Sequence, residues 1–584
     1  MVNETTGGSP AARRIGSRWG AHPGDDGAWD FGLWAPGQDS VALDLDGARH
    51  EMTKGDDGFW RASVTAKAGQ SYKFAIGGQS YPDPASRRQD GDVHAPSVLV
   101  DAAPRAGRDS WAGRPWAETV VYELHLGTFT PEGTFKAAAA RMADLAETGI
   151  TAVEIMPIAQ WRGNRGWGYD GVLNYAPHPA YGTPDELHDL VEAAHAAGIS
   201  VFLDVVYNHF GPDGAYIHAI APEFFDEGRM TPWGAAIAFD KPAVRDFFMD
   251  SALYWLVEFN IDGLRFDAIH QIQDTVQPTF IVELAQRVRE AGLPRPIHLI
   301  TEDERNIVGY FENGVIDGTW NDDWHHSVHV SLTGESNDYY SDYAHDPVGD
   351  LVTCMAEGQV WQGKPRPGTD HLRGEPSGHL PWTCFVNANQ NHDQVGNRLM
   401  GERLITLAGE DRAKTVHALL LCLPFIPMLF MGEEVGEEAP FMFFCDHDGE
   451  LARMTREGRM KEFGFPPGSE DKMPDPNAAE TMEACRPFKG DPARQDRWRA
   501  MTRQLLALRR EKVVPLIASG RAGAAQVTRT SDRSVHAIWP FEAGQIECWL
   551  NIGTTPDQAP DVSGADHVVH DIASDPFAFA VKYS

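Results

Sequence analysis

Eight short apolar runs alternate with segments of helical period in the central part of the chain, and this alternation constrains the fold more than any other feature. Strand-like runs separated by helices are typical of βα units, whose strands assemble into a parallel sheet. Eight units predict an α/β fold, a (β/α)8 TIM barrel with insertions, whose active site lies at the C-terminal ends of its strands. The predicted strands are residues 120–124, 152–156, 200–205, 263–267, 297–302, 315–320, 383–388 and 426–431.

Two segments between these runs carry helix signals that support the alternation. Thr183 is predicted to cap a helix in which Pro184 occupies the first turn and Glu186 completes a capping box. Apolar residues then follow at helical spacing until Gly198. A second helix is predicted over residues 240–259.

The regions on either side of the predicted barrel show short alternating runs separated by turn residues, a pattern typical of β-domains. We therefore predict an N-terminal β-sandwich over residues 1–105, a catalytic barrel over 106–515 and a C-terminal β-sandwich over 516–584. The stretch 101–118, rich in Ala, Arg, Pro and Gly without a period, is the predicted linker between the first two.

The charge of the chain limits its partners. It carries 50 basic and 84 acidic residues, a net charge of −34, which repels nucleic acid and anionic membranes and suits a neutral substrate. No stretch reaches the roughly 18 uninterrupted apolar residues of a membrane span, and the start lacks a charged-then-apolar signal. The six cysteines are widely spaced without a C-x-x-C pair, which favours buried thiols in a reducing compartment. We expect a cytoplasmic protein.

Three acidic residues, Asp267, Glu302 and Asp393, each stand where an apolar run meets a polar segment. An unpaired carboxylate in an apolar core is costly or stays protonated, so these side chains are expected to share one cleft. Two carboxyl groups on opposite sides of an acetal bond can cleave it: one protonates the leaving oxygen, and the other attacks the anomeric carbon or activates water. A retaining pair would lie about 5–5.5 Å apart.

The neighbours of these acids suggest how their roles are divided. The acid needs a raised pKa and the nucleophile a lowered one. Arg265 lies two residues before Asp267 on the same face of the predicted strand, where it would keep Asp267 ionised. A charged Asp303 beside Glu302 would raise the pKa of Glu302. Glu304 is the better rival for the role of proton donor, because alternation puts Asp303 on the opposite face.

Four segments, in order, resemble the four sequence regions of the α-amylase superfamily, glycoside hydrolase family 13: residues 204–209, 263–267, Glu302 after its apolar run, and 391–393. The resemblance implies a retaining α-glucan enzyme with an N-terminal domain like a carbohydrate-binding module. It implies that Asp267 is the nucleophile, Glu302 the general acid/base and Asp393 the carboxylate that grips the sugar hydroxyls. It also implies sugar contacts, through ring stacking and imidazole hydrogen bonds, from Tyr169, His209, Arg265 and His392.

Further segments, at residues 168–172, 176–184, 320–326 and 441–463, resemble one subgroup of this superfamily. The subgroup hydrolyses the α-1,4 bond next to the terminal α,α-trehalose of malto-oligosyltrehalose, in a pathway with a malto-oligosyltrehalose synthase. It releases trehalose and a malto-oligosaccharide. Candidates for distinguishing trehalose from maltose are Asp322, Asp323 and His447. Asn208 stands where many amylases bind calcium, but no Asp-rich loop completes such a site, so we predict no metal and no cofactor.

Several alternatives stay open. A glycogen branching or debranching enzyme would share the three acids and the flanking β-domains, and branching would deliver the chain to a sugar hydroxyl instead of water. An inactive glucan-binding relative is the alternative outside enzymes, although the intact acids weigh against it. His209 has the alternative of bonding a loop, and Arg265 and His392 of supporting the acids without touching sugar. Arg456, Arg459 and Lys461 are predicted to form a solvated helix face.

Overall fold

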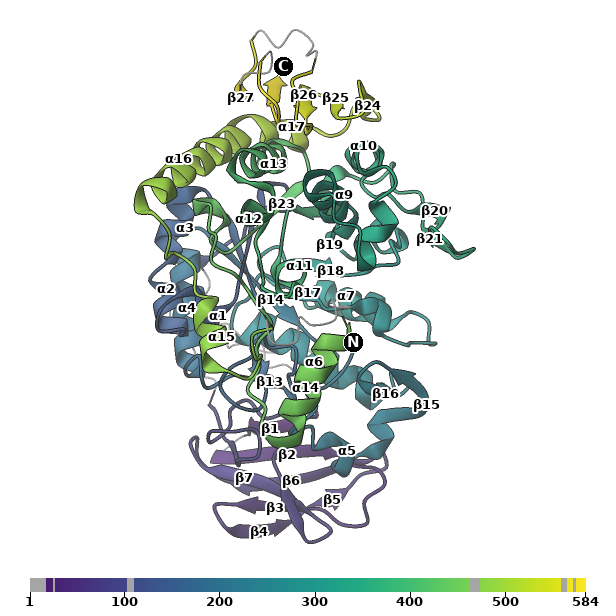
Figure 1. The fold of residues 1–584 in the computed structure, drawn as a ribbon. Helices are drawn as coiled ribbons and strands as arrows, with labels where there is room; N and C mark the ends of the chain where they lie inside the picture. The colour runs from purple at the N-terminus through teal and green to yellow at the C-terminus, as the bar shows by residue number, and fades with distance from the viewer. Residues whose placement is uncertain (1–16, 25–26, 102–109, 463–472, 558–563, 571–573) are drawn as a thin grey trace.

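The computed structural model describes residues 17–24, 27–101, 110–462, 473–557, 564–570 and 574–584. Eight strands form a closed parallel barrel in chain order, and β23 (Ile426–Phe430) closes it by pairing with β10 (Val121–Leu124). Each predicted run contains one of these strands, so the predicted barrel is confirmed (Figure 1). The other six strands are β11 (Ala152–Ile155), β14 (Ser200–Val205), β17 (Gly263–Phe266), β18 (His298–Thr301), β19 (Gly318–Trp320) and β22 (Phe385–Ala388).

The inside of the barrel changes from apolar to charged along the strands. One buried apolar cluster takes residues from seven of the strands: Val121, Ala152, Phe202, Ile300, Trp320, Val386, Ala388, Ile426 and Met428. Because side chains alternate with a period of two, the residues two positions after Val121, Ala152 and Phe202 face the same way. These residues are Glu123, Glu154 and Asp204, and they are buried with Arg265 of β17. This layer of ionisable residues therefore lies next to the C-terminal strand ends, where Asp267 and Glu302 follow.

The predicted helices are confirmed. Helix α4 (Pro184–Ala196) begins at a complete capping box: the Glu186 N–H donates to Thr183 Oγ1 at 3.2 Å, and the Thr183 N–H donates to Glu186 Oε2 at 2.9 Å. Helix α6 (Pro242–Glu258) also contacts the N-terminal domain. Trp19 Nε1 donates to the Ala243 carbonyl at 3.1 Å, so this helix joins the barrel to that domain.

The N-terminal domain is built from two sheets, as predicted. The first has the order β1-β2-β6-β5, and the second has the order β4-β3-β7-β8 with β9 paired to β7. Phe31 of the first sheet meets Tyr72 of the second edge to face at 5.3 Å between ring centroids. The strands are β1 (Gly20–Pro23), β2 (Ala28–Trp34), β3 (Ala42–Leu45), β4 (Ala48–Glu51), β5 (Thr53–Lys54), β6 (Phe59–Thr65), β7 (Ser71–Ile76), β8 (Gln79–Tyr81) and β9 (Ser97–Val98).

The C-terminal β-domain is confirmed as a sheet, but the predicted sandwich needs a correction. Among the described residues it forms one five-stranded antiparallel sheet, β24-β25-β26-β28-β27, at the opposite end of the molecule from the N-terminal domain (Figure 1). Helices supply the second layer: Trp539 donates to the Met355 carbonyl of α10 (Pro347–Glu357), and the Tyr583 hydroxyl donates to the Cys422 carbonyl of α13 (Glu410–Cys422). The strands are β24 (Gln526–Arg529), β25 (Ser534–Phe541), β26 (Gly544–Asn551), β27 (His567–Val569) and β28 (Phe579–Tyr583).

Part of the predicted linker over 101–118 falls on residues 102–109, outside the described residues, and the domain boundaries stay predictions. None of the helices in the described parts of the chain combines the length and the apolar character that a membrane crossing requires.

Candidate active site

Arg265 joins the acids at the C-terminal end of the barrel. Its guanidinium is fully buried and donates to Asp204 at 2.6 Å, to Asp267 at 3.0 Å and to Glu302 at 2.6 Å. The ring of Trp320 lies over it, with 3.9 Å between Arg265 Cζ and the ring centroid. Three hydrogen-bonded carboxylates and an aromatic face hold this cation in one position, so it fixes the two candidate catalytic acids relative to each other.

Asp267 directly follows β17 and is held from two sides. Arg265 donates to Oδ1, while Asn208 Nδ2 donates to Oδ2 at 2.8 Å and to the Asp267 carbonyl at 2.9 Å. The Asn208 side chain is therefore used to orient Asp267. These contacts fix both oxygens of the carboxyl group, as an attack in one direction requires.

The backbone after Asp267 is strained and is hydrogen-bonded to Glu302. Ala268 adopts a left-handed conformation, with φ 40° and ψ 52°, which costs an L-residue about 1–2 kcal/mol. In this turn the Ala268 N–H donates to Glu302 Oε2 at 2.9 Å, and the Ile269 N–H donates to the Glu302 carbonyl at 3.0 Å. The strained turn therefore ties the end of β17 to the residue after β18.

Glu302 has the surroundings of a proton donor. Burial raises the pKa of Glu302 well above its usual range, against the opposing charge of Arg265. The negative charges of Asp267, Asp393 and Asp322 add to the rise. A carboxylic acid in this environment keeps its proton at higher pH than an exposed one, which general acid catalysis requires.

The predicted cause of this raised pKa was wrong. Asp303 directs both carboxylate oxygens to Arg305, at 2.7 and 2.8 Å, and the charges that act on Glu302 come from other strand ends. Glu304, the predicted rival, is 59% exposed, and its carboxylate lies 4.0 Å from His270. The geometry favours Glu302 over Glu304 as the proton donor.

Asp393 lies on α11 (His392–Gly396), a single helical turn after β22. Asn391 caps this helix by accepting from the N–H groups of Asp393 at 2.9 Å and Gln394 at 3.3 Å. Asn397 Nδ2 donates to Asp393 Oδ1 at 2.7 Å. Because the charge of Asp393 raises the pKa of Glu302, the three predicted acids gather at one end of the barrel.

His392 and Tyr169 form a stacked pair beside the acids. Their ring centroids lie 5.0 Å apart at an interplanar angle of 20°. His392 Nδ1 meets Glu123 at 2.5 Å, and the Tyr169 hydroxyl donates to Asp204 at 2.6 Å. Burial lowers the pKa of His392, but Glu123 outweighs it, so the net shift is upward. The two rings therefore have fixed positions from which to contact a sugar.

His209 contacts a loop, as its alternative interpretation predicts. Nε2 lies 3.0 Å from the Tyr169 carbonyl, and Nδ1 is hydrogen-bonded to the Asn208 side chain. One face of its ring stacks on Trp233, with centroids 4.1 Å apart, and Trp233 is 48% exposed. Although both nitrogens of His209 are hydrogen-bonded, the stacked rings of His209 and Trp233 can still form a wall against which a sugar packs.

The three candidates for recognising trehalose have different surroundings. Asp322 belongs with the acids: burial, and next the charge of Asp393, raise the pKa of Asp322 to about 7. Asp323 is buried and accepts from Asn306 at 2.9 Å, Tyr343 at 2.5 Å and the Val360 N–H at 2.6 Å. These bonds indicate that Asp323 holds loops together.

His447, the third candidate, lies next to Asp170, the residue after Tyr169 of the stacked pair. Its Nε2 is 3.6 Å from the carboxylate of Asp170, and its N–H donates to Asn477 Oδ1 at 3.0 Å. The contact with Asp170 connects His447 to the chain segment that carries Tyr169, and His447 stays a candidate.

Four buried residues of the barrel strands near Arg265 and His392 were not identified from sequence: Glu123, Glu154, Asp204 and Trp320. Glu123 and Glu154 each interrupt an apolar run with a charge, and that interruption was the available signal. Burial raises the pKa of Glu154 well above its usual range, which favours the protonated form of this acid inside the barrel.

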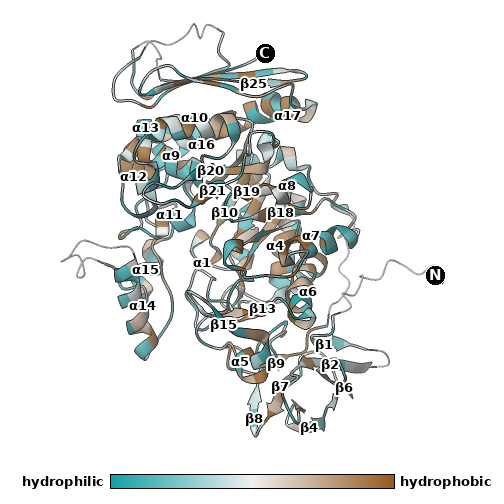
Figure 2. Ribbon diagram, turned by 90° about the vertical axis from the view of Figure 1, so that its right-hand side faces the viewer, coloured by the Kyte–Doolittle hydropathy of each residue, from teal (hydrophilic) through white to brown (hydrophobic). Residues whose placement is uncertain are grey.

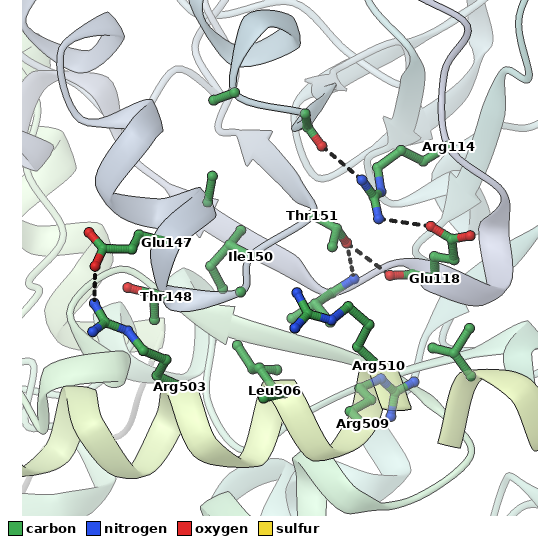
Figure 3. A pocket seen from close by; sticks show the side chains of 17 residues that line it. Arg114, Glu118, Glu147, Thr148, Ile150, Thr151, Arg503, Leu506, Arg509 and Arg510 are labelled. Carbon is green, nitrogen blue, oxygen red and sulfur yellow. Dashed lines mark hydrogen bonds and ion pairs between the residues drawn. The ribbon is translucent and has the colours of Figure 1, made fainter. Parts of the chain in front are cut away.

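A cavity of about 530 Å³ lies away from this site (Figure 3). Val120, Thr151 and Gly198 line it just before β10, β11 and β14, which places it at the N-terminal end of the barrel. Two of its arginines are paired: Arg114 with Glu118 at 2.8 Å and Arg503 with Glu147 at 3.1 Å. None of the predicted site residues lines this cavity. In such barrels, residues at the N-terminal ends of the strands contribute to stability, and catalytic residues lie at the C-terminal ends.

Comparison with known proteins extends this description. Carbohydrate-binding module 48, the isoamylase N-terminal domain, matches residues 18–93, and the alpha amylase catalytic domain matches residues 87–223. A malto-oligosyltrehalose trehalohydrolase of Deinococcus radiodurans is 40% identical over 511 residues, covering 85% of this chain and 84% of the relative. One of Saccharolobus solfataricus is 40% identical over 448 residues, covering 75% and 79%. The crystal structure of a putative alpha amylase from Salmonella typhimurium matches with a TM-score of 0.93 at 45% identity, covering 97% of this chain and 100% of that one.

Proposed function

This chain belongs to the malto-oligosyltrehalose trehalohydrolase family of α-amylase-type enzymes, and on that premise we propose that it hydrolyses the α-1,4-glucosidic bond next to the terminal α,α-trehalose of malto-oligosyltrehalose. The products are trehalose and a shortened malto-oligosaccharide. One observation carries the assignment of roles. A single guanidinium, Arg265, is hydrogen-bonded to both Asp267 and Glu302, while burial and the charges of Asp267, Asp393 and Asp322 raise the pKa of Glu302.

In the first step, Asp267 attacks the anomeric carbon of the glucosyl unit on the malto-oligosaccharide side of the bond. Glu302 transfers its proton to the bridging oxygen, the C–O bond breaks, and trehalose leaves with a new hydroxyl group. The malto-oligosaccharide stays bound to Asp267 through an ester. Arg265 donates to Asp267 Oδ1 and holds it in line for the attack.

In the second step, Glu302 is a carboxylate and takes a proton from water. The water oxygen attacks the anomeric carbon, the ester bond breaks, and Asp267 returns to its ionised form. Two displacements at one carbon retain its configuration. Asp393 is assigned to bind the sugar hydroxyls, and Tyr169 and His392 to stack on and bond the same glucosyl ring.

Recognition of trehalose is assigned to the side of the cleft that receives the leaving group. Asp322 and His447 are the proposed contacts there, while the internal hydrogen bonds of Asp323 give that residue a structural role. A malto-oligosyltrehalose synthase would supply the substrate. We place the enzyme in a reducing compartment, the cytoplasm, which is where six buried free thiols persist.

Product analysis on malto-oligosyltrehalose tests the proposal. We expect trehalose as the small product and an α-configured new reducing end, observed by NMR before mutarotation. Glu302→Gln should lower kcat by about 10²–10⁴-fold, and Asp267→Ala by more. Glu304→Gln, which removes an exposed acid two residues away, is the matched control and should keep wild-type activity.

Other outcomes would contradict it. Products formed only by transfer to another glucan would indicate a branching enzyme. Faster release of maltose from plain maltodextrin would indicate an amylase. Equal activity of Asp267→Ala and wild type would show that Asp267 is not the nucleophile.

A further inference from the structure

Helix α14 (Gly449–Glu462) connects the outside of the molecule to the candidate active site. Together with α15 (Ala479–Ala484) it stands to one side of the barrel (Figure 2). Arg456 fits the predicted solvated face, since it is 45% exposed and lies 3.5 Å from Asp475. Arg459 does not fit it, because its side chain is half-buried and reaches α11.

Arg459 is connected to Asp393 through the side chain of Asn397. Arg459 Nη2 donates to Asn397 Oδ1 at 2.9 Å and to the Gly396 carbonyl at 3.2 Å. Asn397 Nδ2 in turn donates to Asp393 Oδ1 at 2.7 Å. The Arg459 guanidinium also lies over the ring of Phe443, with 4.5 Å between Cζ and the ring centroid. Two successive hydrogen bonds therefore separate α14 from a proposed catalytic carboxylate.

The hydrogen-bonding chemistry of Arg459 determines the orientation of the Asn397 side-chain amide. A guanidinium can only donate, so Arg459 holds the Asn397 carbonyl oxygen toward itself and leaves the amide NH₂ facing Asp393. If the amide rotated by half a turn, its oxygen would face the carboxylate, and Asp393 would lose a donor and meet a repulsive partner. One helical turn has little rigidity of its own, so α11 depends on such outside contacts.

We propose that Arg459 is a positioning residue for Asp393, acting through the side-chain amide of Asn397. The inference rests on the proposed function, because it assumes that Asp393 contributes to glucan cleavage. The inference makes α14 part of the support of the active site, although most residues of this helix are exposed to solvent. A purely structural role, anchoring α14 through Phe443, is the alternative.

Kinetics of Arg459→Gln test the inference, with Arg456→Gln on the same helix as the matched control. We expect kcat of Arg459→Gln to fall by up to about 10²-fold, the effect of a small misplacement of a reacting group. Arg456→Gln should keep wild-type kcat. Arg459→Lys should recover part of the loss, because an ammonium still donates to Asn397 but lacks the second donor of the fork.

A double-mutant cycle separates positioning from anchoring. Asn397→Ala removes the donor to Asp393 without adding a charge, so it should lose activity by itself. Adding Arg459→Gln to Asn397→Ala should then cost little more, because both changes break one path. Full, additive losses would show that Arg459 acts elsewhere. Wild-type kcat in Arg459→Gln, at an unchanged unfolding temperature, would also overturn the inference.

The two proposals fail in different ways. If wild type released no trehalose but cleaved plain maltodextrin, the proposed function would be wrong, and the same variants would still test Arg459 on maltodextrin. If wild type released trehalose and Arg459→Gln did so equally fast, only the inference about Arg459 would be wrong.

Discussion

Arg265 of β17 and Glu302, which directly follows the neighbouring strand β18, share a hydrogen bond of 2.6 Å. The bond opposes the raised pKa of Glu302, because a guanidinium favours the ionised form of a carboxyl group. Burial and three neighbouring carboxylates outweigh it. Glu302, the proposed proton donor, is therefore positioned by a cation while its ionised form is disfavoured by the surroundings.

Replacing Arg265 should damage both stability and activity. Arg265→Gln leaves Asp204, Asp267 and Glu302 without their shared cation, and breaking a buried ion pair from one side costs about 3–5 kcal/mol. Arg265→Lys should lose less stability because the ammonium keeps the positive charge, but it should still lose some, since it cannot reproduce three bonds of a planar fork. Urea unfolding measures the first effect and trehalose release the second. Unchanged unfolding of Arg265→Gln would contradict the structure.

Removing the charge of Asp322 should shift the pH dependence. The Asp322 carboxylate helps raise the pKa of Glu302, so Asp322→Asn should lower that pKa. Glu302 must be protonated to act, and the alkaline limb of kcat/KM should therefore move to lower pH. The pKa of Asp322 itself is about 7, so its charge is present mainly above that pH. The effect of Asp322→Asn should therefore appear in the part of the profile above about pH 7. A limb that stays in place or moves to higher pH would exclude this coupling, and Glu304→Gln is the control.

Glu123 should stabilise the fold in a pH-dependent way through His392. The pKa of His392 is raised above its ordinary value of 6.5, so the charged pair stabilises the protein fully below about that pH. The stabilisation is lost as pH rises through the raised pKa in the folded state. Glu123→Gln should therefore lower the free energy of unfolding more at pH 6 than at pH 9.

The partner of Glu123 supplies the control for this prediction. In a His392→Gln background, Glu123→Gln should lose its pH dependence, because the titrating group is gone. An equal effect at pH 6 and pH 9 in the otherwise wild-type protein would contradict the pairing.

The sequence predicted the barrel and its acids because the signals were local. Each strand is a short apolar run, and Asp267 and Glu302 directly follow two of them, so alternation alone places them near the strand ends. What could not be predicted depends on contacts between distant segments. Glu123 and His392 are 269 positions apart. Asp303 is the nearest charge to Glu302 in sequence, yet its side chain turns to Arg305.

Arg459 shows the same limit for an exposed helix. The charged, amphipathic sequence of α14 indicates a solvated surface, and most of that surface is exposed. Whether one arginine of such a helix reaches a neighbouring segment depends on where the helix is placed in the fold. The position of α11 beneath it comes from strand β22, far earlier in the chain.

Gly396 is required for the packing of α11, and its replacement provides a test of that packing. A Cβ atom at this position would lie 2.1 Å from the Trp167 ring atoms, and the buried Trp167 ring is stacked on Phe441. Gly396→Ala should therefore destabilise the protein by about 1–3 kcal/mol, as overpacking does. Because α11 carries His392 and Asp393, kcat should fall as well.

Gly458 of α14 is the matched control, because a Cβ atom there meets nothing within 4 Å. Gly458→Ala should leave kcat unchanged and favour the helix by about 0.5–1 kcal/mol, since alanine loses less backbone freedom than glycine. Thermal unfolding and trehalose release, measured on both variants, separate the outcomes. If Gly396→Ala were as stable and active as Gly458→Ala, Trp167 could not pack on α11 as the structure shows, and the position of Asp393 would lose that support.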